Sequence, residues 1–292
     1  MNRAIKPLHA YNFPDFIELN REKADDTVTL TFGDHARLVL GVKHGRYMSP
    51  FSAPFGGPDF RGYPSAALLE EISETLLNLP GQVTLTLPPD FYSPFTAPLA
   101  IHLLNDKRWD VTVDTNYHFD LSRLDNYSGL ITDSARKLLA QAERAGLRTV
   151  TIADDDTRAQ LTAYRLLAEN RQAKGRSLSM TFDEILKTSA IIHTDWFMTL
   201  HGDIPVAAAV CHNAGAWTDR VIYWGHLPEH SALRPVNKLA IDLFRYYDMT
   251  GSAIVDIGPA SIHGIPDPGL CRFKESIGCR PTPRYTFTSR SK

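Results

Sequence analysis

The fold is decided by RVIYWGHLPEH (residues 220–230) and the helical pattern that follows it, PVNKLAIDLFRYYDMTG (235–251). The first segment contains a strand, Val221 to Trp224, and a loop connects that strand to the helix. A second strand, AIVDIG (253–258), comes next, and GLCRFKESIGCRPTPRYTF (269–287) predicts a further helix and strand. This order of elements indicates an α/β domain.

The first half of the chain also predicts α/β structure, in short pieces. Two β-rich runs are separated by Gly33-Asp34, a hairpin turn signal. The strands are expected at 28–32, 36–45, 82–89 and 109–121, and the helices at 64–79 and 98–105.

The second half begins after a predicted linker, residues 122–129. A helix is expected at 130–145, capped by Asp133 or Ser134. Thr181 and Glu184 have the spacing of a capping box at the start of another helix. The other predicted elements are a strand at 148–153, helices at 157–174 and 181–192, and three strands within 196–225.

The composition is that of an ordinary globular protein. The chain has 292 residues, which predicts two domains of about 100–200 residues each. Hydrophobic residues make up 43% and charged residues 22%, and the formal net charge is −2. There is no basic stripe of the kind that binds long nucleic acid, so a DNA-binding role is not expected, although the composition does not exclude a brief contact with a tRNA end.

The sequence carries no sign of a membrane or secretory location. The N-terminus, MNRAIKPLHAYNF (1–13), has no apolar run of seven residues, and nowhere do eighteen apolar residues occur together. Cys211, Cys271 and Cys279 lie outside any C-x-x-C pattern, which is typical of thiols in a reducing compartment. We expect a cytoplasmic protein without a membrane span.

Two motifs give the chain a resemblance to a known family. GLCRFK (269–274), followed by Gly278, matches the family's late G-L-x-x-F-K motif. Residues 136–146 (RKLLAQAERAG) are similar to its helix with R-x-x-x-x-A-x-R/K-x-G, and Ile204 to Ala209 is similar to its small apolar strand. Over residues 128–288 the chain resembles the GNAT superfamily of acyl-CoA N-acyltransferases, and within it the Fem-type branch.

The resemblance implies an α/β fold of two tandem GNAT-like domains, each a mixed central sheet flanked by helices. Residues 1–125 would form a degenerate first domain, and residues 126–292 the domain with the donor cleft. In this fold the acyl donor inserts where two parallel strands splay apart. Val221 to Trp224 would be the fourth strand and Ala253 to Asp256 the fifth.

The expected donor follows from a departure from the family pattern. CoA-dependent members carry Q/R-x-x-G-x-G/A after the fourth strand, where backbone N–H groups bind the pyrophosphate. Residues 230–237 (HSALRPVN) contain no glycine, and Pro235 has no N–H. Fem-type relatives also lack this loop, and many use aminoacyl-tRNA. The implied donor is therefore acyl-CoA, such as acetyl-CoA, or aminoacyl-tRNA, with Arg234 and Asn237 at its phosphate.

Three residues are candidates for catalysis. The resemblance places Lys274 at the substrate site, where an ammonium can stabilise the oxyanion formed when an amine attacks an ester or thioester. The alternative is a solvated lysine on a terminal helix. Asp256 and His263 are candidate bases, with a structural carboxylate and an incidental loop histidine as the alternatives.

Four residues are candidates for binding the substrate. Phe273 and Tyr223 would line the acceptor pocket, and their alternative role is packing. Arg136 and Arg144 lie eight residues apart on one predicted helix and could form a cationic rim for a carboxylate or phosphate. The alternative is a surface helix whose arginines pair with neighbouring acids.

Other chemistries lack their sequence motifs. The eleven histidines and three cysteines form no zinc-ligand spacing, so no metal is expected. The chain also lacks a Walker loop, a G-x-G-x-x-G and a G-x-S-x-G elbow.

The sequence therefore predicts an N-acyltransferase that moves an acyl or aminoacyl group to a small-molecule or peptide amine. The alternative is a non-enzymatic protein that keeps the fold as a ligand-binding or scaffolding module. A cleft lined by Lys274 and Asp256 would favour the enzyme. A cleft plugged by Trp224 or Phe273 would favour the alternative.

Overall fold

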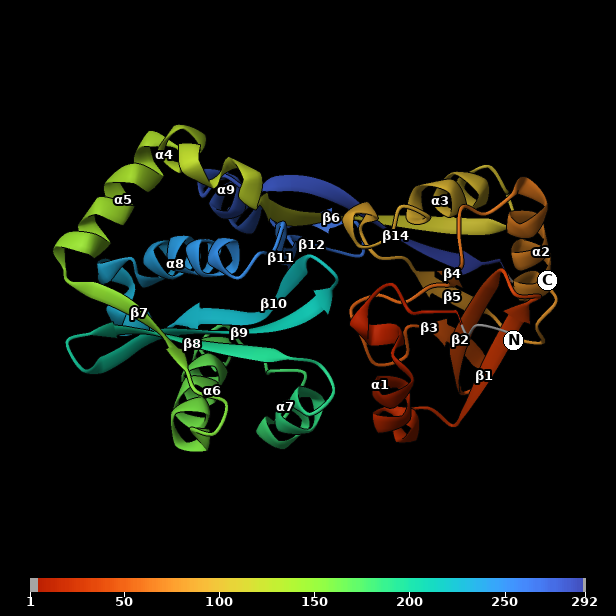
Figure 1. Ribbon diagram of the computed structural model, residues 1–292, viewed down its shortest axis with the longest axis horizontal. Helices are drawn as coiled ribbons and strands as arrows, with labels where there is room; N and C mark the ends of the chain where they lie inside the picture. Colours follow the sequence, from red (N-terminus) through yellow and green to blue (C-terminus); the bar gives the residue numbers. More distant parts are fainter. Residues whose placement is uncertain (1–4, 291–292) are drawn as a thin grey trace.

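Figure 1 shows the computed structural model, a long mixed sheet with helices on both faces, in which residues 5–290 are described. Residues 1–4 and 291–292, at the outer ends of the two predicted domains, lie outside the described residues. The described part has a twelve-stranded sheet in the order β1-β2-β3-β5-β14-β6-β11-β10-β9-β8-β7, with β4 paired to β2. No helix within residues 5–290 is both long and apolar enough to cross a bilayer.

The first half of the chain forms one end of the sheet. Its hairpin turns at Gly33, whose φ of +56° is a conformation that glycine adopts without strain. Helices α2 (Ala66–Leu77) and α3 (Thr96–Leu104) pack on the sheet over a core that includes Leu40 and Phe287. The strands are β1 (Asp26–Phe32), β2 (Ala36–Lys43), β3 (Arg46–Ser49), β4 (Asp59–Phe60) and β5 (Val83–Thr86), and α1 (Pro14–Leu19) precedes them.

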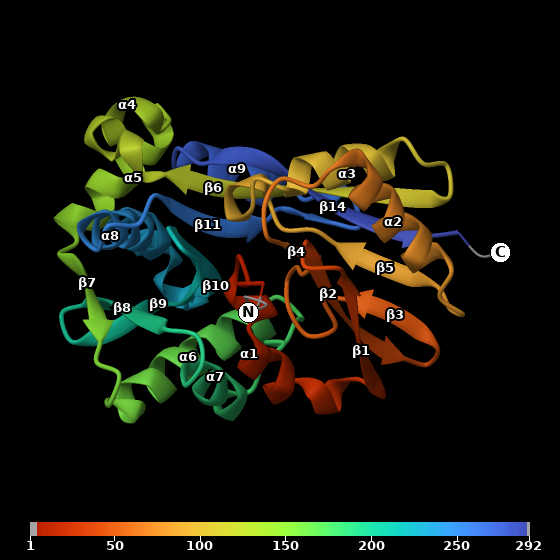
Figure 2. The same ribbon diagram turned by 45° about the vertical axis from the view of Figure 1, so that its right-hand side comes forward.

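The second half forms the other end of the sheet, between two layers of helices. Figures 1 and 2 show α8 (Pro235–Met249) on one face and α6 (Thr157–Gln172) with α7 (Phe182–Ser189) on the opposite face. Helices α5 (Asp133–Arg144) and α9 (Pro268–Ser276) lie on the side of α8. The strands are β7 (Leu147–Ile152), β8 (Thr194–His201), β9 (Ile204–Gly215), β10 (Thr218–His226) and β11 (Ile254–Pro259).

Two long strands join the halves into one sheet. β6 (Trp109–Asp120) belongs to the first half and pairs with β11 of the second. β14 (Arg280–Ser289) returns from the end of the chain and lies between β5 and β6, with ten residue pairs to β6 alone. The predicted boundary at residue 125 therefore separates segments whose strands interleave, and the division into two domains stays a prediction.

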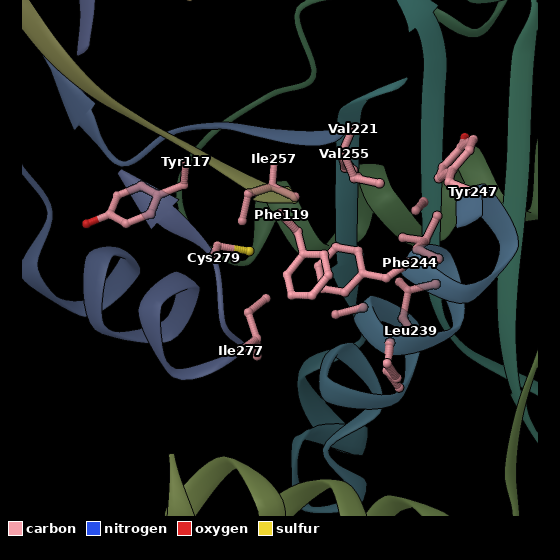
Figure 3. Close-up of a cluster of buried hydrophobic side chains, with 14 of the residues drawn as sticks. Tyr117, Phe119, Val221, Leu239, Phe244, Tyr247, Val255, Ile257, Ile277 and Cys279 are labelled. Carbon is pink, nitrogen blue, oxygen red and sulfur yellow. The ribbon is translucent and has the colours of Figure 1, made fainter. Parts of the chain in front are cut away.

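The core of the second half is built on α8, whose apolar residues recur on one face. Phe244 is fully buried, and its ring stacks on that of Phe119 from β6 with centroids 4.2 Å apart, as Figure 3 shows. Val255 and Ile257 of β11 and Ile277 after α9 belong to the same cluster. This cluster fixes α8 over the strands that form the candidate site.

The structure corrects the sequence predictions in several places. The predicted linker, residues 122–129, is a 3-10 helix (Leu121–Asn126) followed by α4 (Tyr127–Leu130), because Leu121 and Tyr127 are buried in the core of the second half. The cap of α5 is Thr132, whose hydroxyl accepts from the N–H of Ala135. β3, β4 and the hairpin of β12 (Ser261–Ile262) and β13 (Ile265–Pro266) had not been predicted. The capping box of α7 is confirmed.

Phe244→Ala should destabilise the protein by about 3–5 kcal/mol, because it removes a buried ring and leaves a cavity beside Phe119. Equilibrium urea unfolding measures this change. Met249→Ala on the same helix is the matched control, since its side chain is 79% exposed and should cost little. Equal effects of the two substitutions would contradict the assigned core.

Candidate functional site

The candidate site lies where two parallel strands separate. β10 and β11 pair over only three rungs, the last of which joins Arg220 to Asp256. Beyond it β10 pairs with β9 alone as far as His226, whereas β11 stays paired with β6 across a bulge, with Pro259 opposite Asn116. The edge of β10 that faces β11 therefore has unpaired backbone groups beyond Arg220, as the sequence predicted for the fourth and fifth strands.

A buried ion pair closes the narrow end of this splay. The Arg220 guanidinium donates to Asp256 Oδ2, which also accepts from the Tyr92 hydroxyl at 2.9 Å. Asp256 Oδ1 accepts from Asn116 Nδ2 at 2.8 Å and from the Gly258 N–H at 2.9 Å. Burial by itself raises the pKa of a carboxyl, but Arg220 and the other donors outweigh it and hold the pKa of Asp256 below its usual value.

Asp256 thus holds its neighbours in place through hydrogen bonds. It is fully buried, and both of its oxygens already accept hydrogen bonds. A carboxylate with a lowered pKa and occupied oxygens is a weak proton acceptor. Its geometry matches the structural alternative, while its role as a base stays a prediction.

Lys274 is also buried, next to the same strand. Its ammonium donates to the carbonyl oxygens of Ile257 and Gly258 at 2.8 Å and of Pro259 at 3.0 Å. Burial lowers the pKa of Lys274 to about 8, although nearby Asp256 opposes this shift. All three ammonium protons are therefore used within the protein, and they hold the end of β11.

Gly258 lets β11 turn at this point. Its φ is +75°, a left-handed conformation that glycine adopts without strain. The N–H of Gly258 donates a hydrogen bond to the Asp256 side chain, and the carbonyl of Gly258 accepts one from the Lys274 ammonium. The turn that moves β11 away from β10 is therefore fixed from both sides by charged side chains.

Two aromatic rings meet beside the splay. Trp224 of β10 and Phe273 of α9 are half-buried, and their rings touch edge to face with centroids 5.9 Å apart. Both pack against the core of the second half. The contact brings together the two residues that the sequence analysis named as possible plugs of the donor cleft.

Tyr223 lies on the opposite face of β10 from Trp224. Its ring is buried under α6, and its hydroxyl contacts Ser179 Oγ at 2.6 Å and accepts from the Met180 N–H at 3.1 Å. The hydroxyl thus holds the segment between α6 and α7. The predicted role of Tyr223 in acceptor binding stays a prediction.

The remaining predicted residues are exposed and dispersed. His263 occupies the tip of the β12–β13 hairpin with φ +51°. Arg136 donates to Asp133 and to the Ser128 carbonyl, as expected for a surface helix. Arg144 is exposed near the end of the same helix. No described contact joins His263 or either arginine to Lys274.

The start of α8 offers a phosphate fewer free backbone N–H groups than a glycine loop does. Arg234 is exposed and adopts φ +58° as the N-cap, and Pro235 is the first helical residue. The N–H of Asn237 is already bonded to the Arg234 carbonyl at 3.1 Å. A phosphate here would be bound by side chains more than by N–H groups.

Basic side chains that could bind a phosphate lie at the end of α6, which the sequence analysis had not connected with this site. Asn170 donates to the carbonyl of His226 at 2.6 Å and accepts from Lys174 at 3.3 Å, so the end of α6 is attached to the end of β10. Several basic side chains gather at this junction, and we refer to them as the α6–β10 basic cluster: Arg171, Lys174, Arg176, His226, His230 and Arg234. Within residues 5–290 none of them forms an ion pair with a carboxylate.

The members of the cluster repel one another. Burial first, and then Arg176, lowers the pKa of Arg171. Burial lowers the pKa of Lys174, with Arg171 and Arg176 adding to the shift. The pKa of His226 is lowered by burial and by Lys174, among other cations. An anion bound here would relieve this repulsion, which no described carboxylate does.

The sequence analysis had missed most of this cluster. NRQAKGR (170–176) is a basic run at a helix end, which was a visible signal. Nothing in the sequence showed that this helix end meets the end of β10, because the contact depends on packing of α6 across the sheet. Among the described residues no group of three or more histidine, cysteine or acidic side chains is arranged to hold a metal.

No family model and no curated protein matches the sequence. Solved structures do match its fold. FemX has a TM-score of 0.67 at 12% identity, over 95% of this chain and 91% of its own. The fold is GNAT/Fem-like. The C-terminal domain of a putative lysylphosphatidylglycerol synthetase from Agrobacterium fabrum has a TM-score of 0.63 at 12% identity, over 91% and 84% of the two chains.

The L-PGS structure from Bacillus licheniformis has a TM-score of 0.60 at 14% identity, over 92% of this chain and 85% of its own. These likenesses confirm the predicted fold class, a mixed sheet flanked by helices with a GNAT/Fem-like fold. At such low identity they establish the fold and assign no residue.

Asp256→Ala should cost about 3–5 kcal/mol, because it leaves the buried Arg220 guanidinium without its counter-charge. The double variant Arg220→Met with Asp256→Leu should be less destabilised, since neither charge remains. Urea unfolding of both proteins tests this. Asp203→Ala, which removes an exposed partner of Arg148, is the control and should change little. A double variant as unstable as the sum of its single substitutions would refute the pairing.

Lys274 should make stability depend on pH. Its pKa is about 8 in the folded protein and about 10.4 in an unfolded chain. Between these values the unfolded chain binds more protons, so the free energy of unfolding should rise with pH. The wild type should therefore gain stability over Lys274→Met as pH rises from about 8 towards 10.

Chemical unfolding of both proteins across this range measures the difference. Lys187→Met, at a side chain that is 61% exposed, is the control and should show a constant difference. A constant difference for Lys274→Met as well would argue against a buried ammonium.

Proposed function

We propose that the protein is an acyl or aminoacyl transferase whose donor carries phosphate groups, either an acyl-CoA or an aminoacyl-tRNA, and whose acceptor is an amine. The observation that carries the proposal is the splay of β10 and β11 with the α6–β10 basic cluster at the outer end of β10. The GNAT/Fem-like fold supports the transferase class.

The basic cluster would bind the donor phosphates. Three of its members, Arg171, Lys174 and Arg176, come from the end of α6 and the turn after it, and Arg234 comes from the start of α8. Guanidinium groups suit phosphate because they donate two parallel hydrogen bonds. This arrangement replaces the glycine loop, whose N–H groups the sequence lacks.

The unpaired edge of β10 would stabilise the reacting carbonyl. Beyond Arg220 its outward N–H groups face the splay without a partner on β11. Attack by an amine places negative charge on the carbonyl oxygen, and a preorganised N–H can stabilise that charge by donating a hydrogen bond to it. Lys274 would act by holding β11 away from β10 through its three carbonyl contacts.

Positioning would supply most of the rate in this scheme. The attacking amine must lose a proton, and two acceptors were predicted. His263 has the exposed ring, whereas Asp256 is buried with both oxygens occupied. Of the two, His263 is the better placed to exchange a proton with water.

The contact of Trp224 with Phe273 favours a second candidate function, a non-enzymatic module that binds an anionic ligand. In that case the rings stay together and the basic cluster serves binding alone. The two candidates differ in the effect of Trp224→Ala. An enzyme should accept its donor more readily when the rings no longer meet, whereas a module should bind as before.

Thermal unfolding with free CoA, acetyl-CoA and aminoacyl-tRNA tests the donor site. A ligand at about 100 times its dissociation constant adds roughly 2.7 kcal/mol, which raises the midpoint by several degrees. We expect a rise with at least one donor, and Arg171→Ala with Lys174→Ala should abolish it. The rise should also weaken at high salt.

The matched control is Arg158→Ala with Arg165→Ala, two exposed arginines of the same helix. It should keep the rise. No shift with any of the three ligands would refute a phosphate-bearing donor. A shift without transfer to any amine, unchanged in Trp224→Ala, would favour the non-enzymatic module.

A further inference from the structure

A hollow lies at the end of the sheet formed by β7, away from the β10–β11 splay. It measures about 520 Å³, which is within the range of ligand sites. Figure 1 shows β7 at the left-hand end of the sheet, with α8 above it. We call this hollow the β7–α8 groove, and its lining residues are Leu147, Arg148, Thr149, Val150, Thr151, Phe197, Lys238, Asp242, Arg245, Tyr246 and Met249.

The floor of the groove is the edge of a strand. β7 pairs with β8 on one side, and it is the last strand of the sheet, so within residues 5–290 no strand pairs with its outer side. Five consecutive residues of β7, which point to both faces of the sheet, line the groove. The groove therefore runs along the strand edge, where alternate N–H and C=O groups are free for another chain.

The wall of the groove is one face of α8. Lys238, Asp242, Arg245, Tyr246 and Met249 are spaced by four, three, one and three residues, as one helix face requires. They span about 16 Å of helix, and five residues of β7 span a similar length of about 13–17 Å. A short extended segment fits between the strand and the helix along this length.

The groove offers positive charge on both of its sides, from Arg245 on the helix and Arg148 on the strand. Arg245 is 56% exposed, and its contact with Asp242 Oδ1 is long, at 3.7 Å, because Lys238 already donates to that oxygen at 2.6 Å. Arg148 is also 56% exposed, at 3.5 Å from the fully exposed Asp203. Both guanidinium groups can take a further carboxylate.

The groove also offers an apolar surface. Met249 is 79% exposed at the end of α8, and the half-buried Tyr246 and Val150 lie in the same lining. Methionine is flexible and polarizable, so its side chain adapts readily to a bound apolar group. It is a suitable contact for one apolar side chain of a bound segment.

We propose that the β7–α8 groove binds an extended segment of another protein, which adds to β7 as a further strand. An acidic side chain of the segment pairs with Arg245 of α8, and an apolar side chain packs on Met249 and Tyr246 of the same helix. Main-chain hydrogen bonds to β7 supply affinity, and these two side-chain contacts supply specificity.

Charge decides between this occupant and a second copy of the chain. Edge-to-edge pairing of two copies would bring the sequence LRTVTI (147–152) against itself. Its one charged residue is Arg148, so the second copy would bring a guanidinium and no carboxylate to the groove. An acidic segment complements the groove, whereas the β7 strand of another copy does not.

Two fluorescent, end-capped hexapeptides test the proposal. In both, valine alternates with threonine except at one position, which is glutamate in one probe and lysine in the other. Anisotropy titration of the full chain should show binding of the glutamate probe and at least tenfold weaker binding of the lysine probe. Hydrogen exchange should slow at amides of residues 147–152 when the glutamate probe is bound.

Arg245→Glu should weaken the glutamate probe at least tenfold and strengthen the lysine probe. Arg46→Glu, at an exposed arginine of β3 in the other half of the sheet, is the matched control and should change neither. Unfolding midpoints close to wild type show that the variants are folded. Binding that ignores the probe charge, or that neither probe shows, would overturn the proposal. So would a concentration-dependent dimer that protects residues 147–152 without a probe, because the occupant is then a second copy.

Discussion

The ion pair between Arg220 and Asp256 is the interaction on which the rest of the structure depends. It joins the last paired rung of β10 and β11, so it sets the point at which the strands separate. Burying two charges is costly unless each is paired and hydrogen-bonded, and Tyr92 and Asn116 complete that requirement. Since Tyr92 belongs to the first half of the chain, the same carboxylate also ties the two halves together.

Around this pair, ordinary packing determines where the outer groups lie. The stacked rings of Phe119 and Phe244 hold α8 against β6, and α8 in turn places Arg234 at the end of β10. On the opposite face Asn170 attaches α6 to His226. The basic cluster therefore combines side chains from α6 on one face of the sheet and from the start of α8 on the other, and the end of β10 brings them together.

The sequence predicted the elements whose patterns are local. The period of α8, the Gly33 turn and the Thr181 capping box all appear where they were expected. The resemblance to the GNAT superfamily also implied that β10 and β11 are neighbours that splay apart.

Partners far apart along the chain could not be predicted. Lys274 looked like a free cation, and only the turn at Gly258 brings three carbonyl oxygens to it. Asp256 could be a base or a structural carboxylate, and its partner Arg220 lies 36 positions away on another strand. Asp256 carries its charge in an apolar stretch, and that pattern does not distinguish a buried structural charge from a reactive one.

The place of β14 has a consequence for how the protein is made. Its ten residues fill the gap between β5 and β6, yet the ribosome must translate residues 121–279 after β6 before it reaches them. Until then the first half has two open strand edges and cannot close its sheet. Such late, long-range pairing slows folding and exposes the nascent chain to aggregation, so this first half is a natural client for chaperones during translation.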